Sequence, residues 1–248
     1  METEWDYTER ASTYDKRADY SEECVKELLH VIGLRESDVV ADIGAGTGKL
    51  TKQLLQNGLI VHAIEPNDEM RKRGVANNLG AKVTWADAVG EHTNLHSKSV
   101  SAAFFGSSFN VLKQDLALAE AHRILRPEGW FCCMWNHRDL DDLVQRDIEQ
   151  VIHSFIPNYD YGSRRQDPNE VILRSGLFSE VKTIQKGFTV TMMREDIIAA
   201  WESHDTLYRQ SSGRFEEILA AIEDLLTDPT YTVPYFTRIW YAQALVNK

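Results

Sequence analysis

Residues 39–51 read Val-Val-Ala-Asp-Ile-Gly-Ala-Gly-Thr-Gly-Lys-Leu-Thr, and this stretch decides the fold. Its first five residues are mostly apolar, as in a parallel strand that is buried on both faces. From residue 49 onward, leucines recur at helical spacing. Three glycines separate the two segments: Gly44, Gly46 and Gly48. The stretch therefore predicts a strand, a glycine-rich turn and a helix, which is the junction where Rossmann-type sheets bind nucleotide-like ligands.

Glycines at such a turn adopt backbone angles that other residues avoid, and they let a ligand approach the main chain closely. The same spacing of glycines also occurs in loops that bind NAD or FAD. Here an acid, Asp42, stands two residues before the first glycine, and the Gly-Lys-Ser/Thr ending of a P-loop is absent. In this context the segment resembles motif I of the class I S-adenosylmethionine-dependent methyltransferases. The resemblance implies cofactor binding by Asp42, Gly44, Ala45, Gly46 and Gly48.

A second apolar run, residues 59–64, ends in Glu65, which lies 17 residues after Gly48. A carboxylate at the carboxyl end of a strand can accept hydrogen bonds from both hydroxyls of a ribose. The segment from Glu65 to Met70 resembles the second motif of the same family, which implies that Glu65, Pro66 and Met70 contact the cofactor. After strand-like residues 81–86, Asp87 and Ala88 resemble the acid and small residue that read the adenine.

Two further segments extend the resemblance. Residues 100–105 and the following Gly106-Ser107-Ser108 resemble the fourth strand and its cofactor-lining end, which implicates Ser107. Residues 121–131 resemble a helix, a Leu-x-Pro-x-Gly turn and a fifth strand. The matches follow one another in order over about residues 38–136. They imply an α/β, Rossmann-like methyltransferase sheet of seven strands with the last one antiparallel, an N-terminal helical lid and a helical cap.

We expect one domain over residues 1–248. From the N-terminus onward, its expected parts are an N-terminal lid (1–36), a cofactor-binding core (37–136), an insertion with the final core helix (137–178), and C-terminal strands (179–248) carrying a helical cap (194–229). Within the lid, the resemblance assigns Tyr14 to the cofactor and Tyr20 to the substrate. The alternative is that these tyrosines only fasten the segment to the domain surface.

Composition excludes several classes of function. The formal net charge of −11 disfavours nucleic-acid binding, which depends on clustered Lys and Arg. The basic run at 71–73 falls on a predicted helix and is interpreted as a solvated face. Three cysteines give no disulfide framework, and neither a signal peptide nor an apolar run of membrane-spanning length is evident. We expect a cytoplasmic monomer or homodimer without a membrane partner. The histidines lack metal-ligand spacing, so we expect no metal.

Methyl transfer needs an acceptor atom held behind the methyl carbon, and a base only for some acceptors. Open α/β sheets place their crevices at the carboxyl ends of the strands, which makes Asn110 and His137 candidate catalytic residues. Many relatives have a His-Trp pair where this chain has Asn110-Val111, so the role of that histidine does not transfer. Arg138, Arg164 and Arg165 could clamp an anionic group of the substrate, although surface ion pairing is the alternative.

The leading hypothesis is an S-adenosylmethionine-dependent methyltransferase that acts on an O or N atom of a small molecule, with S-adenosylhomocysteine as product. A second hypothesis keeps the cofactor but uses the sulfonium charge for a cyclisation or rearrangement without methyl transfer. A noncatalytic partner subunit and an NAD oxidoreductase are further alternatives. The intact glycines and acids argue against the noncatalytic role.

Overall fold

A seven-stranded mixed sheet organises the chain, with strand order β3-β2-β1-β4-β5-β7-β6. The structure is a computed structural model that describes residues 16–162 and 166–246. Tyr14, Arg164 and Arg165 lie outside the described residues. The strands are β1 (Val39–Ile43), β2 (Ile60–Ile64), β3 (Val83–Ala86), β4 (Val100–Gly106), β5 (Leu125–Arg138), β6 (Lys182–Met193) and β7 (Thr230–Gln243).

The first five strands pair in parallel, whereas β7 runs antiparallel between β5 and β6. This order confirms the predicted seven-stranded sheet with an antiparallel last strand. It also brings the carboxyl ends of β1 to β5 to one edge of the sheet. A crevice at that edge is the usual ligand site of an open α/β sheet.

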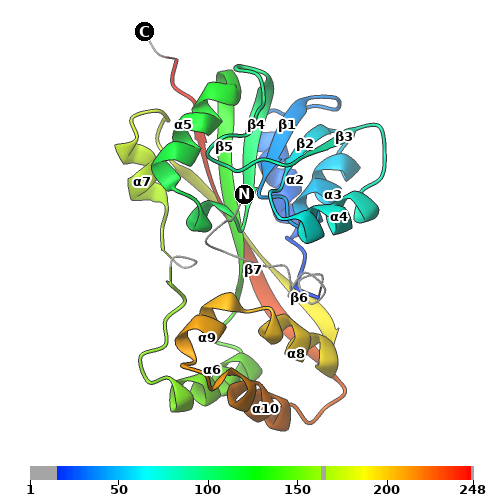
Figure 1. Ribbon diagram of the computed structural model, residues 1–248, viewed down its shortest axis with the longest axis vertical. Helices are drawn as coiled ribbons and strands as arrows, with labels where there is room; N and C mark the ends of the chain where they lie inside the picture. The colour runs from blue at the N-terminus through cyan, green and yellow to red at the C-terminus, as the bar shows by residue number, and fades with distance from the viewer. Residues whose placement is uncertain (1–15, 163–165, 247–248) are drawn as a thin grey trace.

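Helices cover both faces of the core sheet (Figure 1). Buried side chains of α2 (Glu22–Val31) and α3 (Lys49–Gln56) pack against one face, and those of α5 (Gln114–Ile124) and α7 (Asn169–Arg174) pack against the other. The remaining helical elements of the core are α4 (Asp68–Asn77) and the short 3-10 turn η1 (Phe109–Val111). The adjacent Cys132 and Cys133 alternate between the two faces, as neighbouring strand residues do, and both are fully buried free thiols.

The helix α2 belongs to the core, although the sequence assigned it to the lid. Cys24, Val25 and Leu28 are fully buried and join the same hydrophobic cluster as β1, β4 and β5. Ser21 caps this helix by accepting a hydrogen bond from the Cys24 amide at 3.3 Å. Among the described residues, only 16–20 therefore remain as a segment that crosses the sheet edge.

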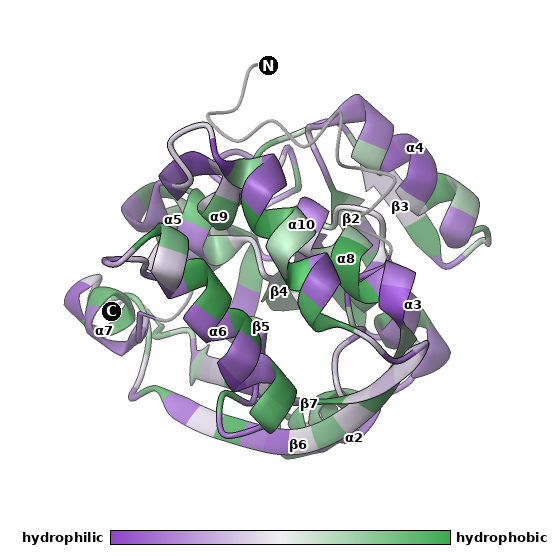
Figure 2. Cartoon of the chain, turned by 90° about the horizontal axis from the view of Figure 1, so that it is seen from below, coloured by the Kyte–Doolittle hydropathy of each residue, from purple (hydrophilic) through white to green (hydrophobic). Residues whose placement is uncertain are grey.

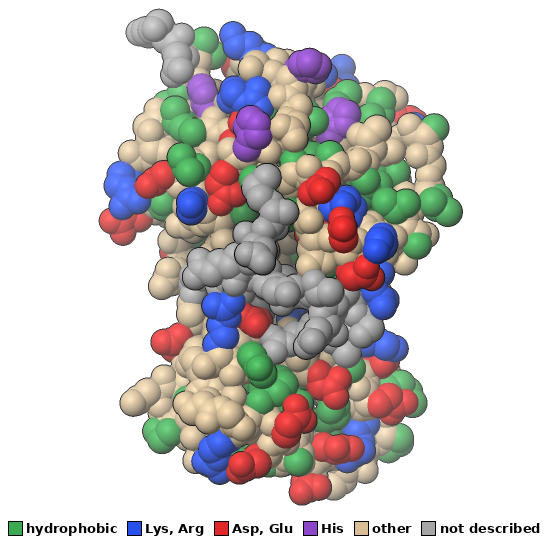
Figure 3. Space-filling model, viewed as in Figure 1, with side chains coloured by type: hydrophobic (Ala, Val, Ile, Leu, Met, Phe, Trp, Pro, Cys, Tyr) green, Lys and Arg blue, Asp and Glu red, His purple; other side chains and the backbone are tan. Residues whose placement is uncertain are grey.

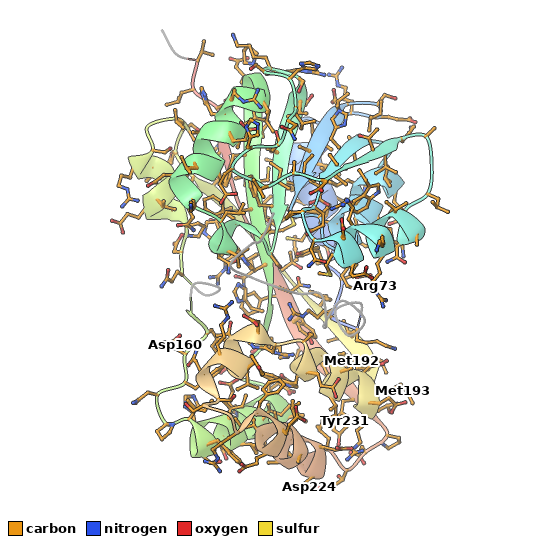
Figure 4. The ribbon with its side chains drawn as sticks, viewed as in Figure 1. Arg73, Asp160, Met192, Met193, Asp224 and Tyr231 are labelled. Carbon is orange, nitrogen blue, oxygen red and sulfur yellow. The ribbon has the colours of Figure 1, made fainter. Side chains whose placement is uncertain are left out.

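A separate hydrophobic cluster forms the cap, which lies at the far end of the long strands β5, β6 and β7 (Figures 1 and 2). Its helices are α6 (Leu143–Phe155), α8 (Arg194–Glu202), α9 (Asp205–Gln210) and α10 (Phe215–Leu225). Because Ile148 and Ile152 of α6 are fully buried in this cluster, the cap includes one more helix than the predicted range 194–229. Figure 4 shows where the strands reach the cap, at Met192, Met193 and Tyr231.

In the part of the chain that is described, no helix is long and apolar enough to cross a bilayer.

Candidate functional site

The glycine-rich loop between β1 and α3 has the geometry that its sequence predicts. The amides of Gly44 and Ala45 both donate to the carbonyl of Ile64, at 2.8 and 3.0 Å, which ties the loop to the end of β2. Gly48 precedes α3 with a φ of +84°, a left-handed value that favours glycine. Gly44 has a φ of +69°, and a Cβ there would lie 2.5 Å from the Cβ of Ser108. Two constraints, one conformational and one steric, therefore require glycine at position 44.

Glu65 lies at the end of β2 and faces this loop. One of its carboxylate oxygens accepts the amide of Gly46 and the other accepts the amide of Asn67, both at 2.8 Å. Burial raises the pKa of this carboxyl, whereas the two amide hydrogen bonds lower it. A carboxylate has about four acceptor positions, so two remain for other donors. The arrangement fits a ribose whose hydroxyls lie against the loop.

Asp42 lies behind the glycine loop, and its contact with the cofactor stays a prediction. Its side chain is buried at the end of β1, where one oxygen accepts the hydroxyl of Thr51 at 2.6 Å. Burial raises the pKa of Asp42 from 3.8 to about 7. The hydrogen bond connects β1 to α3 behind the glycine loop. Asp42 thus supports the loop from within the protein.

We expect Asp42 to make the ligand-free protein less stable as the pH rises. Because the folded-state pKa is raised, the folded chain binds the proton more tightly, and the free energy of unfolding falls between pH 3.8 and about 7. The raised value corresponds to about 4 kcal/mol. Urea denaturation at several pH values should show that Asp42→Asn removes this part of the pH dependence. The exposed change Asp147→Asn on α6 is the control, and an equal effect of both would contradict the prediction.

The helix α4 places an arginine between the two predicted cofactor acids. Arg71 donates to the carbonyl of Glu65 at 2.7 Å, and its guanidinium lies 3.7 Å from the carboxylate of Asp87. The interpretation of this basic run as a solvated face is therefore wrong for Arg71, because the side chain folds back on the ends of β2 and β3. Arg73 does lie on the outer side of the core in Figure 4.

The other residues assigned to the cofactor are near the same strand ends. Asp87 has an exposed carboxylate, whereas its neighbour Ala88 is buried. Met70 is buried beneath the glycine loop, with its terminal methyl 3.6 Å from where a Cβ of Gly46 would lie. The carbonyl of Pro66 accepts a hydrogen bond from Arg71 at 3.2 Å.

Residues 16–20 cross the edge of the sheet between the core and the cap. The hydroxyl of Tyr20 is 2.9 Å from that of Ser107, at the end of β4. The ammonium of Lys49 contacts the carboxylate of Asp19 at 2.7 Å and the carbonyl of Arg17 at 2.8 Å. On the other side, Asn136 donates to the carbonyls of residues 18 and 19 at 3.1 and 2.9 Å. The segment is thus fastened to α3, β4 and β5.

A cavity opens beneath this segment and extends toward the cap, with about 910 Å³ of space when its open mouth is included. Its lining residues come from four parts of the chain: Arg17, Ala18 and Tyr20 of the crossing segment, Lys49 and Ser107 at the sheet edge, Trp135, Asn136, His137 and Arg138 of β5, and Tyr161, Ala200, His204 and Tyr235 of the cap side. The cavity therefore lies at the carboxyl ends of β4 and β5, next to the glycine loop.

The structure separates the two predicted catalytic residues. His137 lines the cavity, and its ring stacks on Phe236 of β7 with the ring centres 5.2 Å apart. Asn110 is not among the lining residues; it accepts a hydrogen bond from the indole of Trp135 at 2.9 Å. Arg138 and Tyr20, predicted to contact substrate, both line the cavity.

Several lining residues escaped the sequence analysis. His204 and Tyr161 come from the cap side, and Arg17 and Lys49 carry no motif that marks them as site residues. Lys49 could have been noticed as the first residue of the helix after the glycine loop. The other residues gave no signal because only the packing of the cap against the sheet edge brings them to the cavity. Among the described residues, no cluster of three or more His, Cys, Asp or Glu could hold a metal ion.

Comparison with known proteins agrees with the fold and the loop. Residues 41–133 match the model of the methyltransferase domain family. An uncharacterized methyltransferase of Mycobacterium tuberculosis is 32% identical over 146 residues, which are 54% of this chain and 56% of that protein. The match thus spans just over half the length of this relative.

Solved structures extend the likeness over nearly the whole chain. A protein of Anaeromyxobacter dehalogenans assigned as a type II methyltransferase aligns with a TM-score of 0.63 at 20% identity, covering 92% of this chain and 97% of that one. The phosphoethanolamine N-methyltransferase 2 of Haemonchus contortus, solved with S-adenosylmethionine, aligns with a TM-score of 0.55 at 13% identity, covering 95% of this chain and 57% of that one. Residues 41–133 thus resemble the methyltransferase domain family, and the fold of nearly the whole chain is that of solved methyltransferases.

Proposed function

We propose that this protein transfers a methyl group from S-adenosylmethionine to an O or N atom of a small molecule bound in the cavity beneath residues 16–20. The observation that carries the proposal is the position of the cavity. It adjoins the glycine loop at Lys49 and Ser107 and continues to the cap at Tyr161 and His204. A methyl donor and an acceptor can therefore meet at the carboxyl ends of β4 and β5.

The cofactor side of the site fits S-adenosylmethionine. Glu65 has acceptor positions for the ribose hydroxyls, Asp87 offers an exposed carboxylate for the adenine amino group, and the glycine loop allows close approach of the ligand. When bound, the cofactor supplies an activated methyl group. The protein then has to orient the acceptor and keep water away from it.

The cavity supplies a candidate for proton removal. His137 lies on β5, is mostly buried and is held by its stacking on Phe236. An imidazole has an ordinary pKa near 6.5, which suits it to take a proton from an acceptor hydroxyl or ammonium at neutral pH. We propose His137 as the general base. Asn110 acts as a positioning residue, since it holds the indole of Trp135, which lines the same cavity.

We expect Asn136→Ala to weaken the closure of the cavity. Asn136 donates to the carbonyls of residues 18 and 19, and it accepts the hydroxyl of Thr237 at 2.6 Å. Loss of two hydrogen bonds to the crossing segment should raise the dissociation rate of S-adenosylhomocysteine by about tenfold. Stopped-flow displacement would measure this rate. Asn169→Ala, at an exposed position of α7 that does not line the cavity, is the control, and an unchanged rate in Asn136→Ala would refute the prediction.

Isotopically labelled S-adenosylmethionine, incubated with the protein and a small-molecule extract of the source cells, tests the proposed function. A labelled product identifies the acceptor by mass, and His137→Ala should reduce its formation. A product that carries no label and forms without consumption of the cofactor would show that the protein catalyses a rearrangement and not a methyl transfer. The absence of any product from an extract of cells grown under many conditions would count against catalysis.

The proposal also keeps the expectation, which rests on the sequence, that the protein is a cytoplasmic monomer or homodimer without nucleic-acid or membrane partners.

A further inference from the structure

The cavity has a charge opposite to that of the chain as a whole. Three of its lining residues are cations, Arg17, Lys49 and Arg138, and two more are histidines, whereas no Asp or Glu of the described chain is among the lining residues. The whole chain has a formal net charge of −11. On the face shown in Figure 3, acidic and basic side chains are interspersed. The concentration of cations around one cavity is therefore a local feature.

Two of these cations have partners within the protein. Arg17 donates to the hydroxyl of Ser203 at 2.8 Å and also to the carbonyl of that residue. The ammonium of Lys49 is 2.7 Å from the carboxylate of Asp19. These contacts fasten the crossing segment to the cap and to α3. Both cations thus have structural tasks in addition to any contact with a ligand.

Arg138 is held in a different way. Its guanidinium lies 4.0 Å from the centre of the Trp201 ring, which is fully buried in the cap. Stacking uses the face of the guanidinium and leaves its N–H groups, which lie in the plane, directed outward from the ring. No carboxylate contact of Arg138 is seen among the described residues. A planar, fixed guanidinium at the wall of a cavity is well suited to bind an oxyanion through two parallel hydrogen bonds.

The position of Arg138 is fixed by the pairing of two strands. It is the last residue of β5 and lies opposite Tyr235 of β7, which also lines the cavity. The cofactor end of the cavity is at Ser107, on the neighbouring strand β4, whereas Arg138 and Trp201 belong to the cap end. An anionic group bound there would lie apart from the atom that receives the methyl group.

We propose that the methyl acceptor is an anion whose carboxylate or phosphate group is bound by Arg138 on its Trp201 support. This inference rests on the proposed function, because it names the class of substrate for that site. Arg138 acts in binding and orientation and takes no part in proton transfer. The nearby His204 and Tyr161 add hydrogen-bonding groups at the same end of the cavity.

Binding of three probes of similar shape tests the proposal: benzoate, phenyl phosphate and the neutral benzamide. Titration calorimetry is carried out on the full chain saturated with S-adenosylhomocysteine. We expect at least one anion to bind about tenfold more tightly than benzamide, and Arg138→Gln to abolish this preference. The anion that binds with the higher affinity shows whether the subsite prefers a carboxylate or a phosphate. Arg146→Gln, an exposed residue of α6 with the same change in charge, should retain the preference.

Affinity for S-adenosylhomocysteine serves as the folding control, since Arg138 does not belong to the cofactor residues. Equal binding of benzamide and both anions, or no anion binding at millimolar concentration, would overturn the proposal. A preference that persists in Arg138→Gln would overturn it as well. If only the proposed function were wrong, the calorimetric preference for anions would persist, but the labelling experiment would show no transfer of methyl. A neutral or cationic labelled acceptor would overturn the anion subsite but leave methyl transfer intact.

Discussion

Replacement of Glu65 by glutamine is expected to weaken the binding of S-adenosylmethionine by about a hundredfold or more. The carboxylate is held by the amides of Gly46 and Asn67, each at 2.8 Å, which orient it toward the glycine loop. Two ribose hydroxyls would donate to its remaining acceptor positions. Glutamine keeps the shape but has one oxygen and an amide group that can only donate. Both charge-assisted hydrogen bonds expected to the ribose would therefore be lost or weakened.

Calorimetric titration with S-adenosylhomocysteine would measure the effect. Glu69→Gln is a matched control, since this half-exposed residue of α4 is four positions away and forms its ion pair with Lys72 at 2.7 Å. We expect the control to bind like the natural protein. An affinity of Glu65→Gln within about threefold of the natural protein would contradict the assignment of this residue to the ribose. Circular dichroism would confirm that the variant is folded.

Substitution of alanine for Gly44 is expected to destabilise the protein by about 2–4 kcal/mol. The left-handed φ of +69° is one cause, and the second is a Cβ that would lie 2.5 Å from the Cβ of Ser108. Ser108 cannot move easily, because its hydroxyl donates to the carbonyl of Ile43 in β1. Relief of the clash would shift the glycine loop, so binding of the cofactor should be lost together with stability.

Gly33→Ala separates the two causes. Gly33 has nearly the same φ, +72°, but a Cβ there would meet nothing within 4 Å. We expect this control to lose only about 1 kcal/mol, the cost of the left-handed backbone. Urea denaturation would measure both variants, and Ser108→Gly should restore part of the stability of Gly44→Ala. Equal losses in the two alanine variants would show that the contact with Ser108 is unimportant.

The cofactor half of the protein was accessible from sequence because its determinants are local. A buried strand, a glycine turn and an amphipathic helix follow one another within residues 39–51, and the backbone of Gly44 and Gly48 has the left-handed angles that their positions predict. The number of strands in the sheet and the antiparallel β7 also agree with the prediction. In contrast, nothing local showed that Arg71 would turn back toward Glu65, since its neighbours Lys72 and Arg73 have the same charge.

The acceptor half depends on contacts between distant segments. The register that places His137 opposite Phe236 and Arg138 opposite Tyr235 joins residues about a hundred positions apart. The burial of α6 against α10 is likewise a matter of tertiary packing between distant segments. The same holds for Asn110, whose hydrogen bond to Trp135 depends on the pairing of β4 with β5.

The sequence by itself determined the strand, the glycine turn and the helix of residues 39–51, because backbone requirements and apolar patterning encode them within a few residues. The rest of the sheet and the acids at the ends of β2 and β3 followed from the resemblance to class I methyltransferases. Only the tertiary structure decided what lines the cavity at the carboxyl ends of β4 and β5. Arg17, Lys49, Arg138 and His204 come together there because the long strands β5 and β7 carry the cap over the edge of the sheet. Spacing along the chain does not encode such a meeting of distant side chains, since it results from packing and strand register.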